Sequence, residues 1–404
     1  MKTNPRNIRT EDYTYVLPEE KIARYPLKQR DSSKLLVYRS GSIGEDIFRN
    51  ITRYLNEGDI LVYNRTRVVR ARLIFKKETG ARIEIFCLEP ENPPAYENNF
   101  SSKEGVSWKC LVGNRKKWKK GPLRMEIPAG DKKVILSANQ EAVKGNESIL
   151  RFEWDNKKYS FSDILSMAGH VPVPPYLNRE DEKIDNTRYQ TIYSEEDGSV
   201  AAPTAGLHFT ERVMSDLEKK GIKTESITLH VGAGTFAPVK SETIGDHSMH
   251  IEHIRIREEM IRNILDRRVI AVGTTSLRTL ESLYWIGHKI STGKITDPAN
   301  IFIEQWYPYD NQTSKPFSYY LELIRDFMNS RDIDTIYART GIIIVPGYKI
   351  RTSAGLITNY HMPGSTLLLL VAAFTGNKWK DIYKYSLEND FRFLSYGDSS
   401  LLLP

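Results

Sequence analysis

The stretch RVIAVGTTSLRTLESLYWIG (residues 268–287) decides the fold class of this chain. Its first six residues have the largely apolar character of a strand that is buried on both faces. After a short polar junction, Leu277, Leu280 and Tyr284 recur near one face of a helix, which we expect Gly287 to end. A strand that leads directly into a helix is the repeating unit of an α/β domain.

The same pattern of buried strands and apolar helices occurs elsewhere in the chain. GLITNYHMPGST leads from a strand into the apolar helix LLLLVAAF (367–374), which Gly376 can end, and GIIIV (341–345) has the composition of another buried strand. GDILVYN (58–64) is expected to join this layer. We therefore predict an α/β main domain, a mixed sheet with flanking helices, made of residues 1–64 and 161–404.

The segment between them has a different pattern. ARLIF and ARIEIFCLE flank the turn sequence KKETG, and KVILS and SILRFEW flank KGNE. Short strands separated by turns predict an inserted β-barrel-like domain over residues 65–160, in which the polar stretch 89–105 is expected to be a loop.

Composition limits the classes of function. The net charge of +7 permits an acidic partner such as RNA without establishing one. The apolar run 367–374 is far shorter than the ~20 residues of a membrane span, and the N-terminus lacks the apolar core of a signal peptide. Two cysteines without a C-x-x-C pair suit a reducing cytoplasm and argue against a zinc ribbon or disulfide framework.

Two junctions could bind a ligand. Residues 273–276 lie where a strand meets a helix, a place that favours a carboxylate or phosphate, although helix capping by Thr275 or Ser276 explains the same residues. VGAGTFAP (231–238) matches G-x-G-x-x-A, but Pro238 prevents the helix that a dinucleotide fingerprint needs. We therefore reject an NAD site there, while the glycines still permit close approach of a ligand.

Five histidines fall in these loops: His208, His230, His247, His250 and His361. Alternation in HIRIR places His253, Arg255 and Arg257 on one strand face, opposite His250 and Glu252, which argues against a metal site. Each histidine alone has the pattern of a structural residue, but as a group they are candidates for proton transfer.

Long blocks of the sequence resemble one known family. They include LPEEKIARYPLKQRDSSKLLVY, GDILVYNRTRVVRARL, YQTIYSEEDGSVAAPTAGLHFT, TLHVGAGTFAPVK, HSMH, VGTTSLRTLES, TNYHMPGSTLLLLVAAF and FRFLSYGDSSLL. In this order, over nearly the whole chain, they look like the S-adenosylmethionine:tRNA ribosyltransferase-isomerase family of queuosine synthesis.

The resemblance implies an unusual use of S-adenosylmethionine (AdoMet) as co-substrate. The ribosyl group passes to the aminomethyl group of a 7-deazaguanine at the tRNA wobble position, giving epoxyqueuosine, adenine and methionine. The sulfonium acidifies the ribose 5′ carbon, so a positioned base can remove a proton there. This reaction requires no metal, redox cofactor or prosthetic group, and we expect no membrane contact and no obligate protein partner.

The resemblance also suggests the site. The catalytic candidates are His208, His230 and His250, with His208 slightly ahead because its neighbours are small. The AdoMet-binding candidates are Thr204, Gly232, Gly234, Thr274, Thr275, Arg278, Asn359 and His361. Two positions depart from the family pattern: Gly364 replaces a lysine that many members have, and NRTRVVRARL carries the additional Arg65 and Arg70.

The loop GNRKKWKKG (113–121) is the candidate RNA contact, through Arg115, Lys116, Lys117, Lys119 and Lys120 around Trp118; a solvated charged loop is the simpler interpretation. Two other functions stay open. An AdoMet-dependent tRNA methyltransferase would release S-adenosylhomocysteine, and a non-catalytic RNA-binding protein would not consume AdoMet.

Overall fold

The main domain is built on a mixed sheet of ten strands. The computed structural model describes residues 4–119, 121–232 and 239–404. In spatial order the strands are β15 (Ile301–Ile303), β16 (Thr335–Thr340), β13 (Glu252–Arg257), β12 (Lys223–His230), β3 (Ile60–Asn64), β14 (Val269–Val272), β17 (Gly355–Asn359), β18 (Ser399–Leu403), β1 (Lys34–Arg39) and β2 (Ser42–Ile47). The predicted α/β fold class with a mixed sheet is confirmed.

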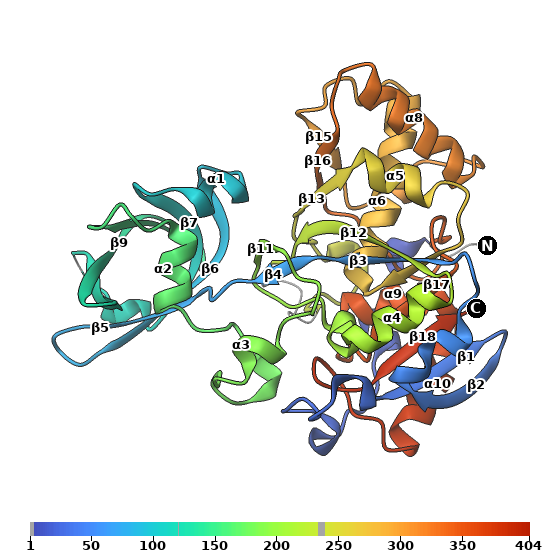
Figure 1. Cartoon of the computed structure of the whole chain (residues 1–404), viewed down its shortest axis with the longest axis horizontal. Helices are drawn as coiled ribbons and strands as arrows, with labels where there is room; N and C mark the ends of the chain where they lie inside the picture. The colour runs from blue at the N-terminus through green and yellow to red at the C-terminus, as the bar shows by residue number, and fades with distance from the viewer. Residues whose placement is uncertain (1–3, 120, 233–238) are drawn as a thin grey trace.

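Helices cover both faces of this sheet (Figure 1). One face packs against α5 (Glu258–Ile264), α6 (Thr274–Ser291), α8 (Phe317–Asn329), α9 (Thr366–Thr375) and α10 (Lys378–Glu388). The other packs against α4 (Glu211–Lys219) and the 3₁₀ helix η5 (Phe48–Tyr54). Alternate residues of one strand serve the two layers: Ile60 and Val62 join the first core and Leu61 the second. This two-sided burial explains the continuous apolar runs in the sequence.

The helix α6 is longer than its sequence predicts. We expected Gly287 to end it, but the helix continues to Ser291. A Cβ at position 287 would lie 2.5 Å from the Cβ of Tyr320, so the glycine allows α6 and α8 to pack closely.

The inserted domain is a six-stranded antiparallel sheet that nearly closes on itself. Its strands are β5 (Arg72–Lys76), β6 (Arg82–Asn92), β7 (Val106–Gly113), β10 (Glu147–Trp154), β9 (Lys132–Lys144) and β8 (Leu123–Ala129), and the end strands β5 and β8 approach each other. It has its own core, to which Phe161 and Leu165 of α2 (Phe161–Ala168) also belong. The helix that follows residue 160 therefore packs on the core of the insertion.

A narrow connection joins the two domains (Figure 1). The chain leaves the main sheet through β4 (Thr66–Val68) and returns through α3 (Asp185–Arg188) and β11 (Glu196–Ser199). Strands β4 and β11 pair in parallel beside the end of β12. No helix in the described residues is long and apolar enough to cross a membrane.

Two sequence predictions of secondary structure are wrong. Residues 341–345 are buried but form no strand. The Gln305 carbonyl accepts a hydrogen bond from the Ile343 amide, and the Tyr309 hydroxyl accepts one from the Val345 amide and donates one to the Ile343 carbonyl. These groups supply the hydrogen bonds that a neighbouring strand would otherwise make. The stretch 89–105 is not a continuous loop: β6 extends to Asn92, and α1 (Tyr96–Ser101) follows. Tyr96 and Phe100 bury their rings against the insertion core, which stabilises this helix in a polar sequence.

Candidate active site

A pocket opens where β14 and β17 end and α6 begins. We call it the threonine pocket, after Thr204, Thr274, Thr275 and Thr358, which line it. Its volume is about 690 Å³, including the part open to solvent. The remaining wall is mainly apolar or aromatic and includes Ala201, Ala202, Pro203, Ala205, Val231, Tyr176, Tyr360, Met362, Leu367 and Leu394. This is the edge at which α/β sheets bind ligands.

The small residues of APTAGLHF have two separate causes. Ala202 and Ala205, with the preceding Ala201, line the threonine pocket, where small side chains leave room for a ligand. Gly206 is explained by protein packing, because a Cβ there would lie 2.0 Å from the hydroxyl of Tyr193. Thr210 caps α4 by accepting a hydrogen bond of 3.3 Å from the Val213 amide.

No side chain among the described residues caps the N-terminus of α6. The N-cap residue is Gly273, at φ 88°, and neither Thr275 nor Ser276 fills the capping role that the sequence suggested. Ser276 instead donates a hydrogen bond of 2.7 Å back to the Val272 carbonyl. The first turn of an eighteen-residue helix therefore faces the pocket with a positive dipole end and two threonine hydroxyls.

His361 and Asn359 hold the opposite wall. The Nε2 of His361 lies 2.9 Å from the Thr358 hydroxyl, and burial lowers the pKa of His361 to about 3. Asn359 donates to the carbonyls of Leu394 and Ser395, at 2.9 and 3.3 Å, and so fixes a loop that lines the pocket. His361 thus lines the pocket as a neutral ring, whereas Asn359 supports it from behind.

His208, the leading candidate base from the sequence, is fully engaged inside the protein. Its Nδ1 lies 2.7 Å from the Ser33 hydroxyl and its Nε2 lies 3.1 Å from Oδ1 of Asn359. Because the amide of Asn359 is oriented by its own two donations, Nε2 of His208 carries the proton. Burial lowers the pKa of His208 to about 4. The ring lies outside the threonine pocket, and its catalytic role stays a prediction.

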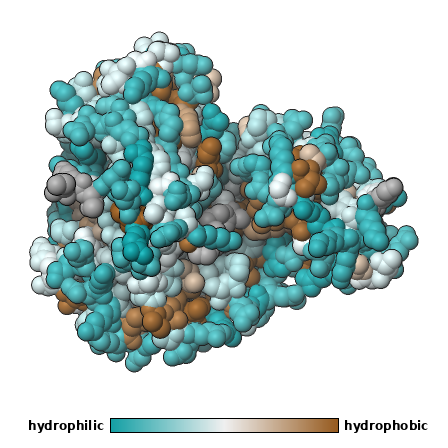
Figure 2. All heavy atoms as spheres, turned by 180° about the vertical axis from the view of Figure 1, so that it is seen from behind, coloured by the Kyte–Doolittle hydropathy of each residue, from teal (hydrophilic) through white to brown (hydrophobic). Residues whose placement is uncertain are grey.

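The other two histidines meet in a second cavity, between the two domains. We call it the histidine cleft; its lining residues are Leu88, Glu89, Tyr96, Lys109, Glu147, His230, Gly232, His250 and Ile251. The inserted domain supplies the first five of these residues, and the main domain supplies the rest. Figure 2 shows the hollow between the domains.

His230 is held by one hydrogen bond and one stacked ring. Its Nδ1 lies 3.2 Å from the Gly198 carbonyl, which assigns the proton to Nδ1 and leaves the Nε2 lone pair as the acceptor. Its ring stacks on Tyr96 at 4.0 Å between centroids and 3° between planes. Burial lowers the pKa of His230 to about 4, so the ring is neutral at pH 7. Gly198, at φ 145°, is required here because a Cβ would lie 2.2 Å from His230.

His250 belongs to a chain of three hydrogen-bonded residues. Its Nε2 lies 3.1 Å from the carboxylate of Glu252, which in turn accepts a hydrogen bond of 2.5 Å from Arg278. Glu252 has no exposed side-chain area, and the Arg278 guanidinium beside it holds the pKa of the carboxyl below its usual value. Nε and Nη2 of Arg278 are buried without a hydrogen-bond partner among the described residues. Arg278 therefore orients Glu252 rather than lining the threonine pocket.

The end of β12 separates the two cavities. His230 and Gly232 line the histidine cleft, while Val231 between them lines the threonine pocket. Successive residues of an extended strand point to opposite sides, which places the two cavities back to back. The predicted residues that line the threonine pocket and those that line the histidine cleft thus lie on the two sides of a single stretch of backbone, whereas His208, Arg278 and Asn359 line neither cavity. Gly234 lies outside the described residues.

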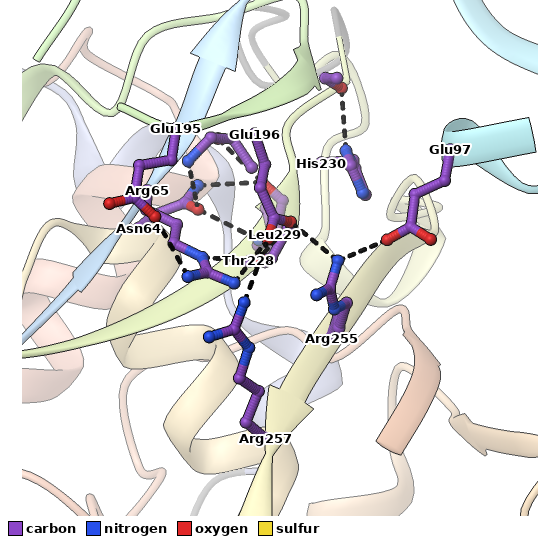
Figure 3. Close-up of polar contacts among 12 residues, drawn as sticks. Asn64, Arg65, Glu97, Glu195, Glu196, Thr228, Leu229, His230, Arg255 and Arg257 are labelled. Atoms are coloured by element: carbon purple, nitrogen blue, oxygen red, sulfur yellow. Dashed lines mark hydrogen bonds and ion pairs between the residues drawn. The ribbon is translucent and has the colours of Figure 1, made fainter. Parts of the chain in front are cut away.

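A network of arginines and glutamates braces this strand (Figure 3). The carboxylate of Glu196 contacts Arg65 at 2.5 Å, Thr228 at 3.0 Å and Arg255 at 3.2 Å. Arg255 also pairs with Glu97 of the inserted domain. Arg65 is buried in this network, so this departure from the family pattern is explained by structure and not by an exposed RNA contact.

The comparisons with known proteins address the chain as a whole. The family described as queuosine biosynthesis protein matches residues 10–402. The chain belongs to the queuosine biosynthesis protein family. The S-adenosylmethionine:tRNA ribosyltransferase-isomerases of Syntrophomonas wolfei and Trichlorobacter lovleyi are 37% and 35% identical to it, over 98% and 97% of this chain and 97% and 99% of theirs. The resemblance that the sequence blocks indicate is confirmed.

The S-adenosylmethionine tRNA ribosyltransferase of Thermotoga maritima is 26% identical, with 97% of this chain and all of that chain covered and a TM-score of 0.45.

Within this queuosine biosynthesis protein, sequence reasoning missed several functional candidates. Tyr96 was hidden in a stretch predicted to be a loop, and no local signal pairs it with His230. Glu252 was placed on the same side as His250 by alternation, but its buried partner Arg278 comes from a different element. Among the described residues, no three His, Cys, Asp or Glu side chains form a group that could hold a metal ion.

The predicted RNA-binding loop follows β7. Lys116, Lys117 and Lys119 are exposed and Arg115 is half-buried; Lys120 lies outside the described residues. Trp118 is buried in the insertion core and donates a hydrogen bond of 2.9 Å to the Gly121 carbonyl, so its ring is not available to stack on a base. An RNA contact through the exposed lysines stays a prediction.

Proposed function

We propose that this chain is an S-adenosylmethionine:tRNA ribosyltransferase-isomerase of queuosine biosynthesis. The observation that carries the proposal is its family membership over residues 10–402, together with relatives of that name at 35–37% identity over nearly the full chain. In the proposed reaction the ribosyl group of AdoMet is transferred and isomerised onto the 7-aminomethyl-7-deazaguanine at the tRNA wobble position. The products are epoxyqueuosine-tRNA, adenine and methionine.

We place AdoMet in the threonine pocket. Its carboxylate would lie at the uncapped N-terminus of α6, where backbone N–H groups and the hydroxyls of Thr274 and Thr275 are available. The alanines and Tyr176 provide the apolar surface that an adenine ring or a thioether chain needs. Thr204 supplies a further hydroxyl on the facing wall. No prosthetic group is needed for this chemistry.

We place the tRNA base in the histidine cleft. A single extended stretch of backbone, with Val231 on one side and His230 and Gly232 on the other, separates the cavities. A ribosyl group bound in the threonine pocket would therefore be close to an acceptor amine in the cleft. With the sulfur side of the ribosyl group extended past the strand end into the cleft, the base that removes the proton beside the sulfonium is His230 or His250, which line the cleft, in preference to His208. Both rings have a partner that fixes their orientation, Gly198 or Glu252.

We also infer the cellular compartment and the partners of the protein. The free, buried cysteines Cys87 and Cys110 suit a reducing cytoplasm, where tRNA modification takes place. We propose that tRNA and AdoMet suffice as partners, with no obligate protein partner.

One experiment tests the reaction. The protein is incubated with AdoMet and with tRNA that carries 7-aminomethyl-7-deazaguanine, and the released small molecules and the RNA are analysed by mass spectrometry. Adenine and methionine are expected in equal amounts with ribosylated tRNA. S-adenosylhomocysteine as the product would favour a methyltransferase, and tRNA binding without AdoMet consumption would favour a non-catalytic RNA-binding protein.

A further inference from the structure

The outward face of the sheet beside the histidine cleft carries arginines and aromatic rings. Ile254 and Ile256 of β13 point into the core, and the alternate residues point away from it. We call the outward set the β13–β16 face; it consists of His253, Arg255, Arg257, Tyr337 and Arg339, with Phe302 of β15 at its margin. Tyr337 is 57% exposed, a large value for an aromatic side chain in a sheet.

Its arginines differ in how well they are neutralised. Arg255 is paired with Glu97 and Glu196. Arg257 reaches Glu196 only at 3.9 Å and is half-exposed. Arg339 contacts Asn300 at 3.4 Å and lies 5.4 Å from the Phe302 ring centroid, and within the described residues it makes no ion pair. Two of the three guanidinium groups are therefore available to an anion in solvent.

This face is continuous with the cleft. His253 is paired in register with His230 across β12 and β13, and its ring lies 5.9 Å from that of Tyr96. Arg255 lies opposite Tyr337 in the register of β13 and β16, and its guanidinium lies 6.0 Å from the Tyr337 ring centroid. A chain that enters the histidine cleft would thus run along Arg255, Tyr337 and Arg257 as it leaves.

We infer that the β13–β16 face binds the single-stranded nucleotides that flank the target base in the anticodon loop. Phosphates lie against Arg257 and Arg339, and one base stacks on Tyr337. Flat sheet faces with exposed aromatic rings and guanidinium groups suit single-stranded RNA, because every base has a stacking face and every nucleotide a phosphate. The inference rests on the proposed function and adds to it the surface that holds the RNA.

The lysine loop (Arg115, Lys116, Lys117 and Lys119) is the competing surface. It offers charge without an exposed ring, since Trp118 is buried. It follows the end of β7 that is remote from α1, whereas the β13–β16 face adjoins α1 directly through Arg255 and Glu97. We therefore expect the lysine loop to contribute less to binding of the anticodon loop.

The test uses the full-length protein and an anticodon stem-loop RNA with the precursor base. In the double variant Arg257→Gln/Arg339→Gln, the slope of log affinity against log salt should fall by about 1.4, since each lost phosphate contact on single-stranded RNA removes roughly 0.7. Tyr337→Ala should weaken binding by about fivefold or more, while Tyr337→Phe, which keeps the ring, should bind normally. The KM for AdoMet should not change in any of these variants.

Matched controls separate the explanations. Arg212→Gln/Lys219→Gln removes two exposed charges from α4, which packs beside η5 on another part of the sheet, and should leave the salt slope unchanged. Lys116→Gln/Lys117→Gln tests the lysine loop. If this loop variant lowers the slope and the β13–β16 variants do not, the inference is wrong. If the wild-type protein releases no adenine with the precursor tRNA, the proposed function itself fails, whatever the binding results.

Discussion

The main domain and the cleft between the domains differ in how they hold their histidines. Within the main domain, His208 has both ring nitrogens within hydrogen-bond distance of protein groups, Ser33 and Asn359. At the cleft, His230 has one nitrogen fixed by the Gly198 carbonyl. Burial lowers the pKa of both rings to about 4. Burial and pKa are therefore shared, and the number of engaged nitrogens is the difference on which we predict His230, rather than His208, to be the better candidate base.

The largest expected effect is a loss of single-turnover rate when a histidine of the cleft is replaced. His230→Ala and His250→Ala should each be tested, and the one that is the base should lose about 10²–10⁴-fold in single-turnover rate. AdoMet binding should be retained, because neither ring lines the threonine pocket. Rapid quench with analysis of adenine release measures the rate, and equilibrium dialysis measures AdoMet binding.

The control for this experiment is Tyr96→Phe, which keeps the stacked ring on His230 and should have near-normal activity. If both histidine variants keep the normal rate while His208→Asn loses it, the comparison is reversed and His208 becomes the base.

The second prediction concerns the carboxylate behind His250. Glu252→Gln removes the negative partner of the buried Arg278, so the variant should lose about 3 kcal/mol of unfolding free energy, at the lower end of what breaking a buried ion pair costs. It should also lower kcat more than it raises the KM for AdoMet, because the amide has one acceptor oxygen and cannot accept from both His250 and Arg278. Urea unfolding and steady-state kinetics measure the two effects.

Glu281→Gln is the matched control on stability. Glu281 is equally buried, but its hydrogen-bond donors are neutral groups of Tyr348, Arg351 and Thr352, and burial raises the pKa of its carboxyl. Its replacement leaves no buried cation unpaired and should cost less. Equal losses in the two variants would show that the Arg278 charge is not what makes Glu252 necessary.

The third prediction is a pH dependence of stability. The folded state holds His208 neutral with a pKa of about 4, whereas the unfolded chain takes up the proton near pH 6.5. The unfolded state therefore binds more protons between these values, and stability is lost as the pH falls from about 6.5 to about 4. For His208 alone the loss is about 3 kcal/mol at pH 4.

His230 and His361 are buried in the same way and add to this slope. In His208→Asn the slope of unfolding free energy against pH should be flatter than in the wild type by close to one proton over this window. An unchanged slope would mean that His208 is protonated in the folded protein, contrary to its hydrogen bonds.

The sequence predicted the elements of this site better than their assembly. Strand–helix junctions at 273–276 and 359–366 were recognisable because apolar runs, polar turns and glycine have local causes. The alternation in HIRIR correctly separated Glu252 from His253. The stacking of Tyr96 on His230 joins residues 134 positions apart from two domains, and no periodicity carries that information. Nor could the sequence distinguish His208 from His230, because hydrogen-bond partners are a property of the folded chain.

The smallest expected effect on catalysis is that of replacing His208. His208→Asn removes the contact with Ser33 and leaves a gap beside Phe48, whose ring lies 5.0 Å from the imidazole. We expect a loss of about 1–3 kcal/mol of unfolding free energy at pH 7, the cost of leaving buried polar groups without partners. Because the ring contacts neither cavity wall that holds substrate in the proposal, the single-turnover rate of the folded variant should be essentially unchanged. The measurement is made at a temperature well below the midpoint of thermal unfolding, so that lost stability is not mistaken for lost catalysis. A variant that is as stable as the wild type but slow in adenine release would contradict the structural assignment and restore His208 as a catalytic residue.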